Sequence, residues 1–247
     1  CIRDSRKLRR KYHVADEYDY RENSIYKTYL ACDAVSDEIL LRNHYRCNKK
    51  IIDFNNKKYY NSKLQVQSDS RERQPLVYVN VDGGPGDMKN TSPAEVEEIM
   101  RYAGENPDKS IAVITPFVNQ RILIERGIKE NGFEHVVCGT VHAFQGDEKD
   151  VVLFSTALSD RTGKGTYDWL KNNKELINVA TSRAKDKLIL LADGKELERL
   201  HQGNEDDDLY ELVQYVKMNG ESKITEKHIS SRALGIQPFS TETEAAF

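Results

Sequence analysis

Short apolar runs alternate along the chain with polar turns and amphipathic segments. Strands are predicted at 38–41, 75–81, 111–114, 136–137, 151–155 and 187–191. Short β-branched runs bounded by turn residues are typical of buried parallel strands. Apolar positions at helical spacing predict helices at 48–60, from Ser92, after Phe117, before Ser182, at 195–201 and at 209–216. The alternation predicts an α/β fold, a mostly parallel sheet between helical layers.

Other segments lack this alternation. Residues 1–14 are dense in Lys and Arg and read as a solvated basic arm, and 16–37 read as an acidic, Tyr-rich loop followed by a short helix. The segment 161–170 reads as a loop. From Glu221 the periodicity is lost, and 237–247 reads as a tail.

Two glycine-containing loops raise the question of a phosphate-binding P-loop. The loop at 82–90 lacks the following Lys-Ser/Thr pair. In TGKGT, Gly165 follows Lys164, which does not fit the spacing of GxxxxGK[ST]. The chain therefore carries no P-loop of its own.

The amino-acid composition limits the kinds of protein to which this chain can belong. The chain has 247 residues, 38% hydrophobic and 31% charged, with a formal net charge of −3. No apolar run is long enough to cross a membrane, so we expect no membrane partner. Four cysteines without CxxC spacing indicate neither a zinc site nor a disulfide framework, and we expect a cytoplasmic or otherwise intracellular protein. The net charge does not exclude nucleic-acid binding, because basic groups can line one groove.

Polar side chains gather in two stretches beside the predicted strands. They are Thr140, His142, Gln145, Gly146 and Glu148 in the first stretch, and Ser182, Arg183 and Lys185 in the second. Ligands of open α/β sheets bind beyond the carboxyl ends of the strands. We therefore expect a site at that edge.

The same residues resemble a known family. TVHAFQGDE at 140–148 resembles motif V of superfamily 1 helicases, and NVATSRAK at 178–185 is similar to motif VI. The resemblance is closest to the 5′-to-3′ branch, superfamily 1B. It implies the C-terminal, RecA-like domain of such a helicase, a three-layer sandwich without a P-loop.

Three further segments extend the resemblance. HYRCNKKIIDF from His44 resembles the HYRCHPKIIxF element, with Asn48-Lys49 in place of His-Pro, and ITPFVNQ at 114–120 resembles motif IV. Residues 3–10 stand where motif III belongs, but the Gly, Gln and Pro of that motif are replaced, the Gln by Lys7. A lysine meets a phosphate as a point charge and lacks the acceptor of an amide.

The resemblance implies a role for each matching residue. Arg46 and Arg183 would be catalytic, contacting the phosphates of ATP, with Arg183 as an arginine finger. Gln145, Gly146, Glu148 and Lys7 would bind the nucleotide. Thr115, Pro116, Phe117, Gln120, Thr140 and His142 would contact single-stranded DNA or RNA. Without the resemblance, Arg183 reads as a cation favoured by a helix C-terminus and Arg46 as a surface residue.

We expect three parts, namely a motif III-like arm with a connecting segment at 1–37, the RecA-like domain at 38–203, and a C-terminal helix with a tail at 204–247. ATP and Mg²⁺ would be held mainly by a preceding RecA-like domain of a longer protein, and this chain alone would not hydrolyse ATP.

The alternative is a helicase-derived adaptor that has lost ATPase coupling, which the replaced motif III residues favour. An unrelated flavodoxin-like domain would make the motif matches coincidental.

Overall fold

A computed structural model of the chain describes residues 2–19, 23–32, 40–82, 88–140 and 148–225. The chain divides into two units, 1–41 and 42–247, and each is described by itself. Among the described residues, no helix combines the length and the apolar character that crossing a membrane requires.

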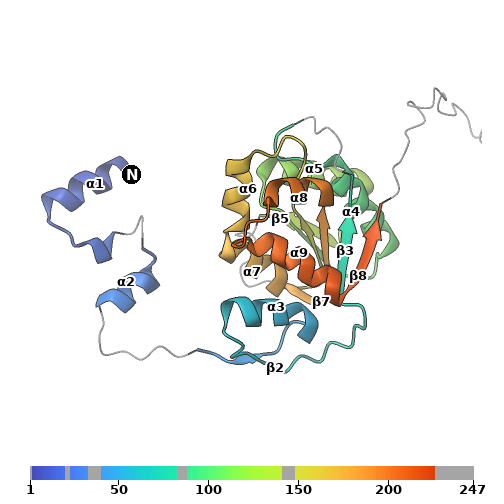
Figure 1. Cartoon of the computed structure of the whole chain (residues 1–247), viewed down its shortest axis with the longest axis horizontal. Helices are drawn as coiled ribbons and strands as arrows, with labels where there is room; N and C mark the ends of the chain where they lie inside the picture. Colours follow the sequence, from blue (N-terminus) through green and yellow to red (C-terminus); the bar gives the residue numbers. More distant parts are fainter. Residues whose placement is uncertain (1, 20–22, 33–39, 83–87, 141–147, 226–247) are drawn as a thin grey trace, which may run out of the picture. The chain divides into compact units, whose positions relative to one another are not determined.

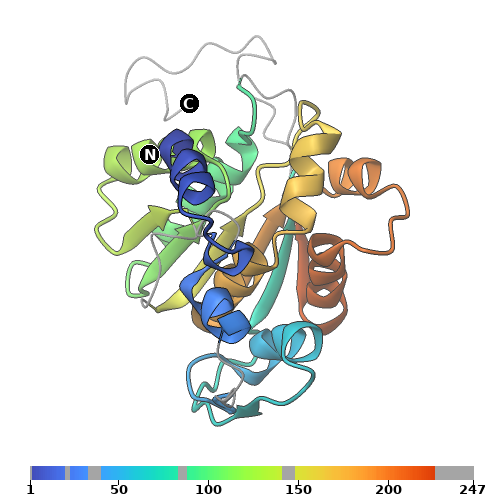
Figure 2. The same ribbon diagram turned by 90° about the vertical axis from the view of Figure 1, so that its left-hand side faces the viewer.

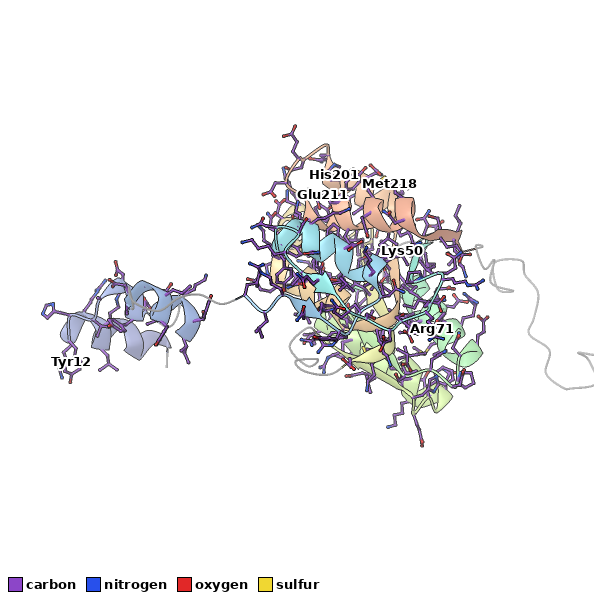
Figure 3. The ribbon with its side chains drawn as sticks, turned by 90° about the horizontal axis from the view of Figure 1, so that it is seen from below. Tyr12, Lys50, Arg71, His201, Glu211 and Met218 are labelled. Atoms are coloured by element: carbon purple, nitrogen blue, oxygen red, sulfur yellow. The ribbon has the colours of Figure 1, made fainter. Side chains whose placement is uncertain are left out.

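The first unit is helical. It contains α1 (Ile2–Lys11), the 3₁₀ turn η1 (Asp16–Tyr18) and α2 (Ile25–Cys32). The basic arm predicted at 1–14 is therefore largely a helix, which suits its Arg, Lys and Leu residues. Arg9 forms ion pairs with Asp16 and, at 2.6 Å, with Asp19. The ring of Tyr12, labelled in Figure 3, is 63% exposed.

The second unit is built on a six-stranded sheet in the order β5-β4-β6-β7-β3-β8. Its strands are β3 (Leu76–Asn80), β4 (Ile111–Ile114), β5 (Val136–Gly139), β6 (Lys149–Ser155), β7 (Ala184–Ala192) and β8 (Glu221–Ile224). Every pairing in this sheet is parallel. Two short strands, β1 (Asn43–His44) and β2 (Gln65–Val66), pair separately.

Helices cover both faces of the sheet. α4 (Pro93–Glu105) and α5 (Val118–Asn131) lie on one face, whereas the other carries α3 (Lys49–Tyr59), α6 (Lys164–Lys171), α7 (Lys174–Ser182), α8 (Gly194–His201) and α9 (Asp208–Asn219). Alternate residues of β3 face the two layers, so Val77 and Val79 join the α4 side while Leu76 and Tyr78 join the other. Figure 2 shows the α4–α5 layer, in green, on one side of the sheet and the orange-to-red helices on the other. The predicted fold class is confirmed.

Two local predictions were wrong, and one strand was missed. The segment 161–170 is not all loop, because α6 buries Tyr167 and Leu170 completely at helical spacing. Leu40 and Leu41 lie outside any strand, and the strand nearby is β1, while 38–39 lie outside the described residues. β8 was not predicted, since all four of its side chains are exposed and leave no hydrophobic alternation.

α9 belongs to the packed unit. The Tyr215 hydroxyl donates to the Lys50 carbonyl of α3 at 2.7 Å, and Lys58 of α3 pairs with Glu211 at 2.6 Å. Figure 3 labels Lys50 and Glu211 on these two helices. The sequence-based division at residue 203 remains a prediction, although α9 and β8 both pack within the unit that begins at Arg42.

The close approach of Gly220 to β3 yields a prediction. A Cβ on Gly220 would lie 2.3 Å from the Leu76 carbonyl oxygen. Gly220→Ala should therefore lower the free energy of unfolding by about 1–3 kcal/mol, the usual cost of overpacking. Urea denaturation measures this. Gly165→Ala is the matched control, because nothing lies within 4 Å of its Cβ position, and it should change stability by no more than about 0.5 kcal/mol.

Candidate functional site

The predicted site residues divide between opposite edges of the sheet. Glu148 directly precedes β6 and Arg183 directly precedes β7, whereas Thr115 follows β4 and Thr140 follows β5. All four strands are parallel, so the first pair lies at the amino-terminal edge and the second at the carboxyl-terminal edge. In Figure 1 the strands point upward, α3 lies below their starts and α6 stands beside their upper ends. The prediction of one site at the carboxyl ends was wrong for Glu148 and Arg183.

Arg46 joins the amino-terminal edge through two contacts. Its Nε donates to Glu148 Oε2 at 2.6 Å, and its Nη1 donates to the Ser182 carbonyl at 3.4 Å. Both side chains of the ion pair are partly open to solvent, with 31% of Arg46 and 51% of Glu148 exposed. These residues are separated by more than a hundred positions in the sequence, so the fold itself assembles the cluster.

Arg183 lies at the same place. It is the C-cap of α7, and its carbonyl accepts a hydrogen bond of 3.2 Å from the Lys149 amide, next to Glu148. Burial raises the pKa of the Cys47 thiol to about 12, and the charges of Arg46, Glu148 and Arg183 also act on it. The three charged side chains therefore lie close enough to Cys47 to act on the same thiol.

Backbone and side-chain bonds fix this arrangement. The Asn48 amide donates to the Lys185 carbonyl at 2.8 Å, and the Cys47 thiol donates to the Ser182 carbonyl at 3.2 Å. Asn48 also caps α3 through Lys50 N, so the helix begins with an N-cap where the HYRCHPKIIxF element has His-Pro. The start of α3 is thereby tied to the α7–β7 junction.

A buried amide ties α3 to α7 about two turns further along. Asn55, fully buried, donates to Asn178 Oδ1 at 2.8 Å and to Thr181 Oγ1 at 2.6 Å. Buried polar networks of this kind rigidify the elements that they join. Two guanidinium groups and one carboxylate are thus presented on a fixed frame, which suits the binding of phosphate oxygens by planar forks.

At the carboxyl-terminal edge, Thr115 is fully buried at the end of β4. Its amide donates to the Gly139 carbonyl at 3.2 Å, but its hydroxyl has no hydrogen-bond partner in the described part of the chain. Buried polar atoms are nearly always paired, so this hydroxyl is exceptional. Pro116 and Thr140, the neighbouring residues of the predicted strand contact, are partly exposed.

Phe117 and Gln120 lie in the interior. Phe117 is 8% exposed, and Gln120, fully buried, exchanges hydrogen bonds with the Ser92 backbone and donates to Ser155 Oγ at 3.0 Å. In this arrangement both residues support the edge from beneath, and their side chains do not line the surface.

The remaining predicted residues lie either outside the described part of the chain or in the first unit. His142, Gln145 and Gly146 lie outside the described residues. Lys7 is an exposed residue of α1 in the first unit. Their predicted roles therefore stay predictions.

Glu95 is a residue whose role sequence reasoning missed. Its carboxyl group, fully buried, accepts from Ser155 Oγ at 2.5 Å and from the Ala157 amide at 3.0 Å. The Ser92-x-x-Glu95 spacing looks like a helix capping box, and Ser92 does cap α4. The carboxyl group instead holds the turn after β6, where Ala157 has a φ of 51°.

Burial raises the pKa of Glu95 to about 8. The hydrogen bonds around Glu95 also indicate a protonated carboxyl group. The Thr156 hydroxyl lies 3.0 Å from the Leu191 carbonyl and 3.3 Å from Glu95 Oε1. A hydroxyl has one hydrogen and a carbonyl only accepts, so the second contact is a hydrogen bond when Glu95 carries the proton. The turn at the carboxyl-terminal edge is held by a carboxyl group whose raised pKa favours its neutral form near pH 7.

Comparison with known proteins shows the family to which the chain belongs. The profile of the AAA_12 family, described as an AAA domain, matches residues 21–195. The chain is 28% identical over 197 residues to the 3'-5' exoribonuclease HELZ2 of Mus musculus, covering 64% of this chain and 7% of that protein. It is 28% identical over 216 residues to the uncharacterized ATP-dependent helicase MJ0104 of Methanocaldococcus jannaschii, covering 76% of this chain and 31% of that protein.

Among solved structures, the C-terminal domain of a possible DNA helicase from Lactobacillus plantarum matches at a TM-score of 0.42 and 17% identity, covering 74% of this chain and 99% of that one. The family profile and the helicase relatives confirm the resemblance drawn from motifs V and VI. The chain spans less than a third of either relative's length.

Protonation of Glu95 makes stability depend on pH. The carboxyl group has a higher pKa in the folded chain than in the unfolded chain, so the folded state binds more protons between about pH 4.5 and 8. The contribution of Glu95 to stability should fall as pH rises through that window, with a slope of at most roughly 1.4 kcal/mol per pH unit.

Glu95→Gln supplies the comparison, because the amide keeps the shape and does not titrate. Urea denaturation at several pH values should show the advantage of the wild type over Glu95→Gln shrinking from pH 5 to pH 8. A difference that stays constant across this range would mean that Glu95 is ionised throughout.

Proposed function

Because the chain belongs to the AAA_12 family, we propose that it is the second motor domain of an ATP-dependent nucleic-acid helicase or translocase. Relatives named as ATP-dependent helicases support this reading. The observation that carries the proposal is the cluster of Arg46, Glu148 and Arg183, which the fold assembles from three separate segments at the amino-terminal edge of the sheet.

ATP would bind between this cluster and a preceding RecA-like domain, which would supply the P-loop and the acidic residues for Mg²⁺. Arg46 and Arg183 would meet the phosphates, since a guanidinium fork stabilises the charge that develops during phosphoryl transfer. Glu148 would accept hydrogen bonds from the ribose of the nucleotide. Without a nucleotide, it holds Arg46 through their ion pair. Gln145, Gly146 and Lys7 would complete the contacts to the nucleotide.

The carboxyl-terminal edge would hold the single strand of DNA or RNA. The Thr115 hydroxyl, buried without a partner among the described residues, would gain a phosphate oxygen as acceptor when the strand binds and the edge adjusts around it. Thr140, Pro116 and His142 would contact the backbone beside it. Phe117 and Gln120, which lie in the interior, would support this contact from below.

A second candidate function is an adaptor that binds nucleic acid or protein without ATPase coupling. The observation that favours it is the replacement of the motif III residues, with Lys7 in place of the glutamine. The retention of Arg46, Glu148 and Arg183 in one cluster favours the motor.

Removal of Arg183 tests the motor. In the full-length protein, Arg183→Ala should lower nucleic-acid-stimulated ATP hydrolysis by roughly three to five orders of magnitude, the usual worth of an arginine finger, while single-strand affinity is retained. Arg101→Ala is the matched control, because Arg101 pairs only with Glu98 and Glu105 of its own helix among the described residues, and it should leave hydrolysis unchanged. Absence of hydrolysis in the wild type, with strand binding intact, would support the adaptor instead.

Replacement of the Thr115 hydroxyl tests the strand contact. Thr115→Val removes a buried polar group without a partner, so the free energy of unfolding should stay level or rise by about 1 kcal/mol. Single-strand affinity should fall by roughly tenfold, the loss of one hydrogen bond to a charged group. Thr181→Val is the control for the assay of stability, because its hydroxyl bonds to Asn55 and Ile177, and its loss should destabilise.

An affinity of Thr115→Val equal to that of the wild type would show that the hydroxyl does not reach the strand. Fluorescence anisotropy with a labelled oligonucleotide measures the affinity.

A further inference from the structure

The chain contains one tryptophan, Trp169, and it lies in an unusual setting. α6 buries Tyr167 and Leu170 completely, yet the indole of Trp169 between them is 49% exposed. Single exposed apolar side chains are common and need no explanation by themselves. What distinguishes Trp169 is the support beneath it and the edge on which it stands.

Phe117 supports the indole. The two ring centroids lie 6.1 Å apart with an angle of 45° between the planes, and Phe117 is itself 8% exposed within the core. An aromatic pair at this separation is favourable beyond its buried area. The indole is therefore in tilted contact with a buried ring, while about half of the surface of Trp169 remains open.

The position of this pair is the carboxyl-terminal edge of the sheet. Phe117 follows Thr115 and Pro116 directly after β4, and α6 follows the turn that leaves β6 (Figure 1). The open indole thus lies beside the segment to which the proposed function assigns the backbone of the single strand.

A second feature of the same edge points to a polar ligand. Three buried donor atoms in the described part of the chain lack hydrogen-bond partners and belong to segments that leave β4 or β6, namely Thr115 Oγ1, Arg121 Nε and Ser159 Oγ. Native structures leave few such atoms, and each calls for an explanation. A nucleic acid offers both an aromatic face for the indole and phosphate oxygens for donors, whereas an apolar protein surface offers only the former.

We propose that Trp169 is the stacking platform for a base of the bound single strand, held in place by Phe117. This inference rests on the proposed strand-binding edge and adds to it the residue that receives a base. Stacking on aromatic side chains is tolerant of sequence, because every base has a π-face. The platform would therefore add affinity without selecting a sequence.

The single tryptophan provides a direct signal. Titration of the chain with an unlabelled oligonucleotide at low salt should change the emission of Trp169, with the same midpoint as the anisotropy of a labelled strand. Trp169→Leu keeps an apolar contact with Phe117 but has no π-face, and it should lower the affinity roughly 5- to 150-fold, equivalent to about 1–3 kcal/mol. Trp169→Phe, which restores an aromatic face, should recover most of the affinity.

Two controls separate stacking from a loss of structure. An abasic strand keeps the phosphates and lacks the bases, so wild type and Trp169→Leu should bind it equally. Met218→Ala removes another exposed apolar side chain, on α9, and should bind like the wild type. Urea denaturation of each variant shows whether it is folded.

The outcomes of these experiments test the Trp169 platform separately from the proposed strand-binding edge. Strand binding with unchanged tryptophan emission and with Trp169→Leu equal to wild type would overturn the platform and leave the strand-binding edge in place. Equal losses of Trp169→Leu on base-bearing and abasic strands would also overturn it. Absence of binding to any strand by the wild type would overturn the strand-binding edge and the platform together.

Discussion

The parallel arrangement of the six strands is the constraint on which the rest of the structure depends. It sends the ends of β4 and β5 to one edge of the sheet and the starts of β6 and β7 to the other. A single stretch of sequence, 140–148, therefore begins at the edge proposed for the strand and ends at the edge proposed for the nucleotide. In the proposed function, the sheet therefore separates the contacts to the nucleotide phosphates from the contacts to the strand phosphates.

Buried polar groups hold each edge in shape. At the amino-terminal edge, Asn55 locks α3 to α7 and so fixes where Arg46 meets Glu148. At the opposite edge, Glu95 and Gln120 bind the turn after β6 to the starts of α4 and α5. Buried polar groups thus fix the positions of the charged and aromatic side chains that would contact ligands. A rigid scaffold of this kind preorganises a site.

Sequence patterns predicted the elements whose burial is strongest. β3 and β4 are apolar β-branched runs, and α3 has an evident buried face, so their positions were confirmed. α6 was missed because its glycines resemble a loop, although Tyr167 and Leu170 bury it. The motifs identified Arg46 and Glu148 but not the edge they share, because the order of residues along a chain does not say at which end of a strand they lie. The Ser92-x-x-Glu95 spacing signals only a helix start, and this local signal conceals the long-range contacts of Glu95.

The central claim is that Arg46 and Arg183 act together on one nucleotide. A double-mutant cycle on nucleic-acid-stimulated ATP hydrolysis by the full-length protein tests it most directly, with Arg46→Ala, Arg183→Ala and the pair. Residues that act as a unit give strongly non-additive losses. If the two arginines act on one nucleotide, the double variant should lose little more activity than the worse single variant. Losses that simply multiply would show that the two arginines work at separate places and would contradict the account.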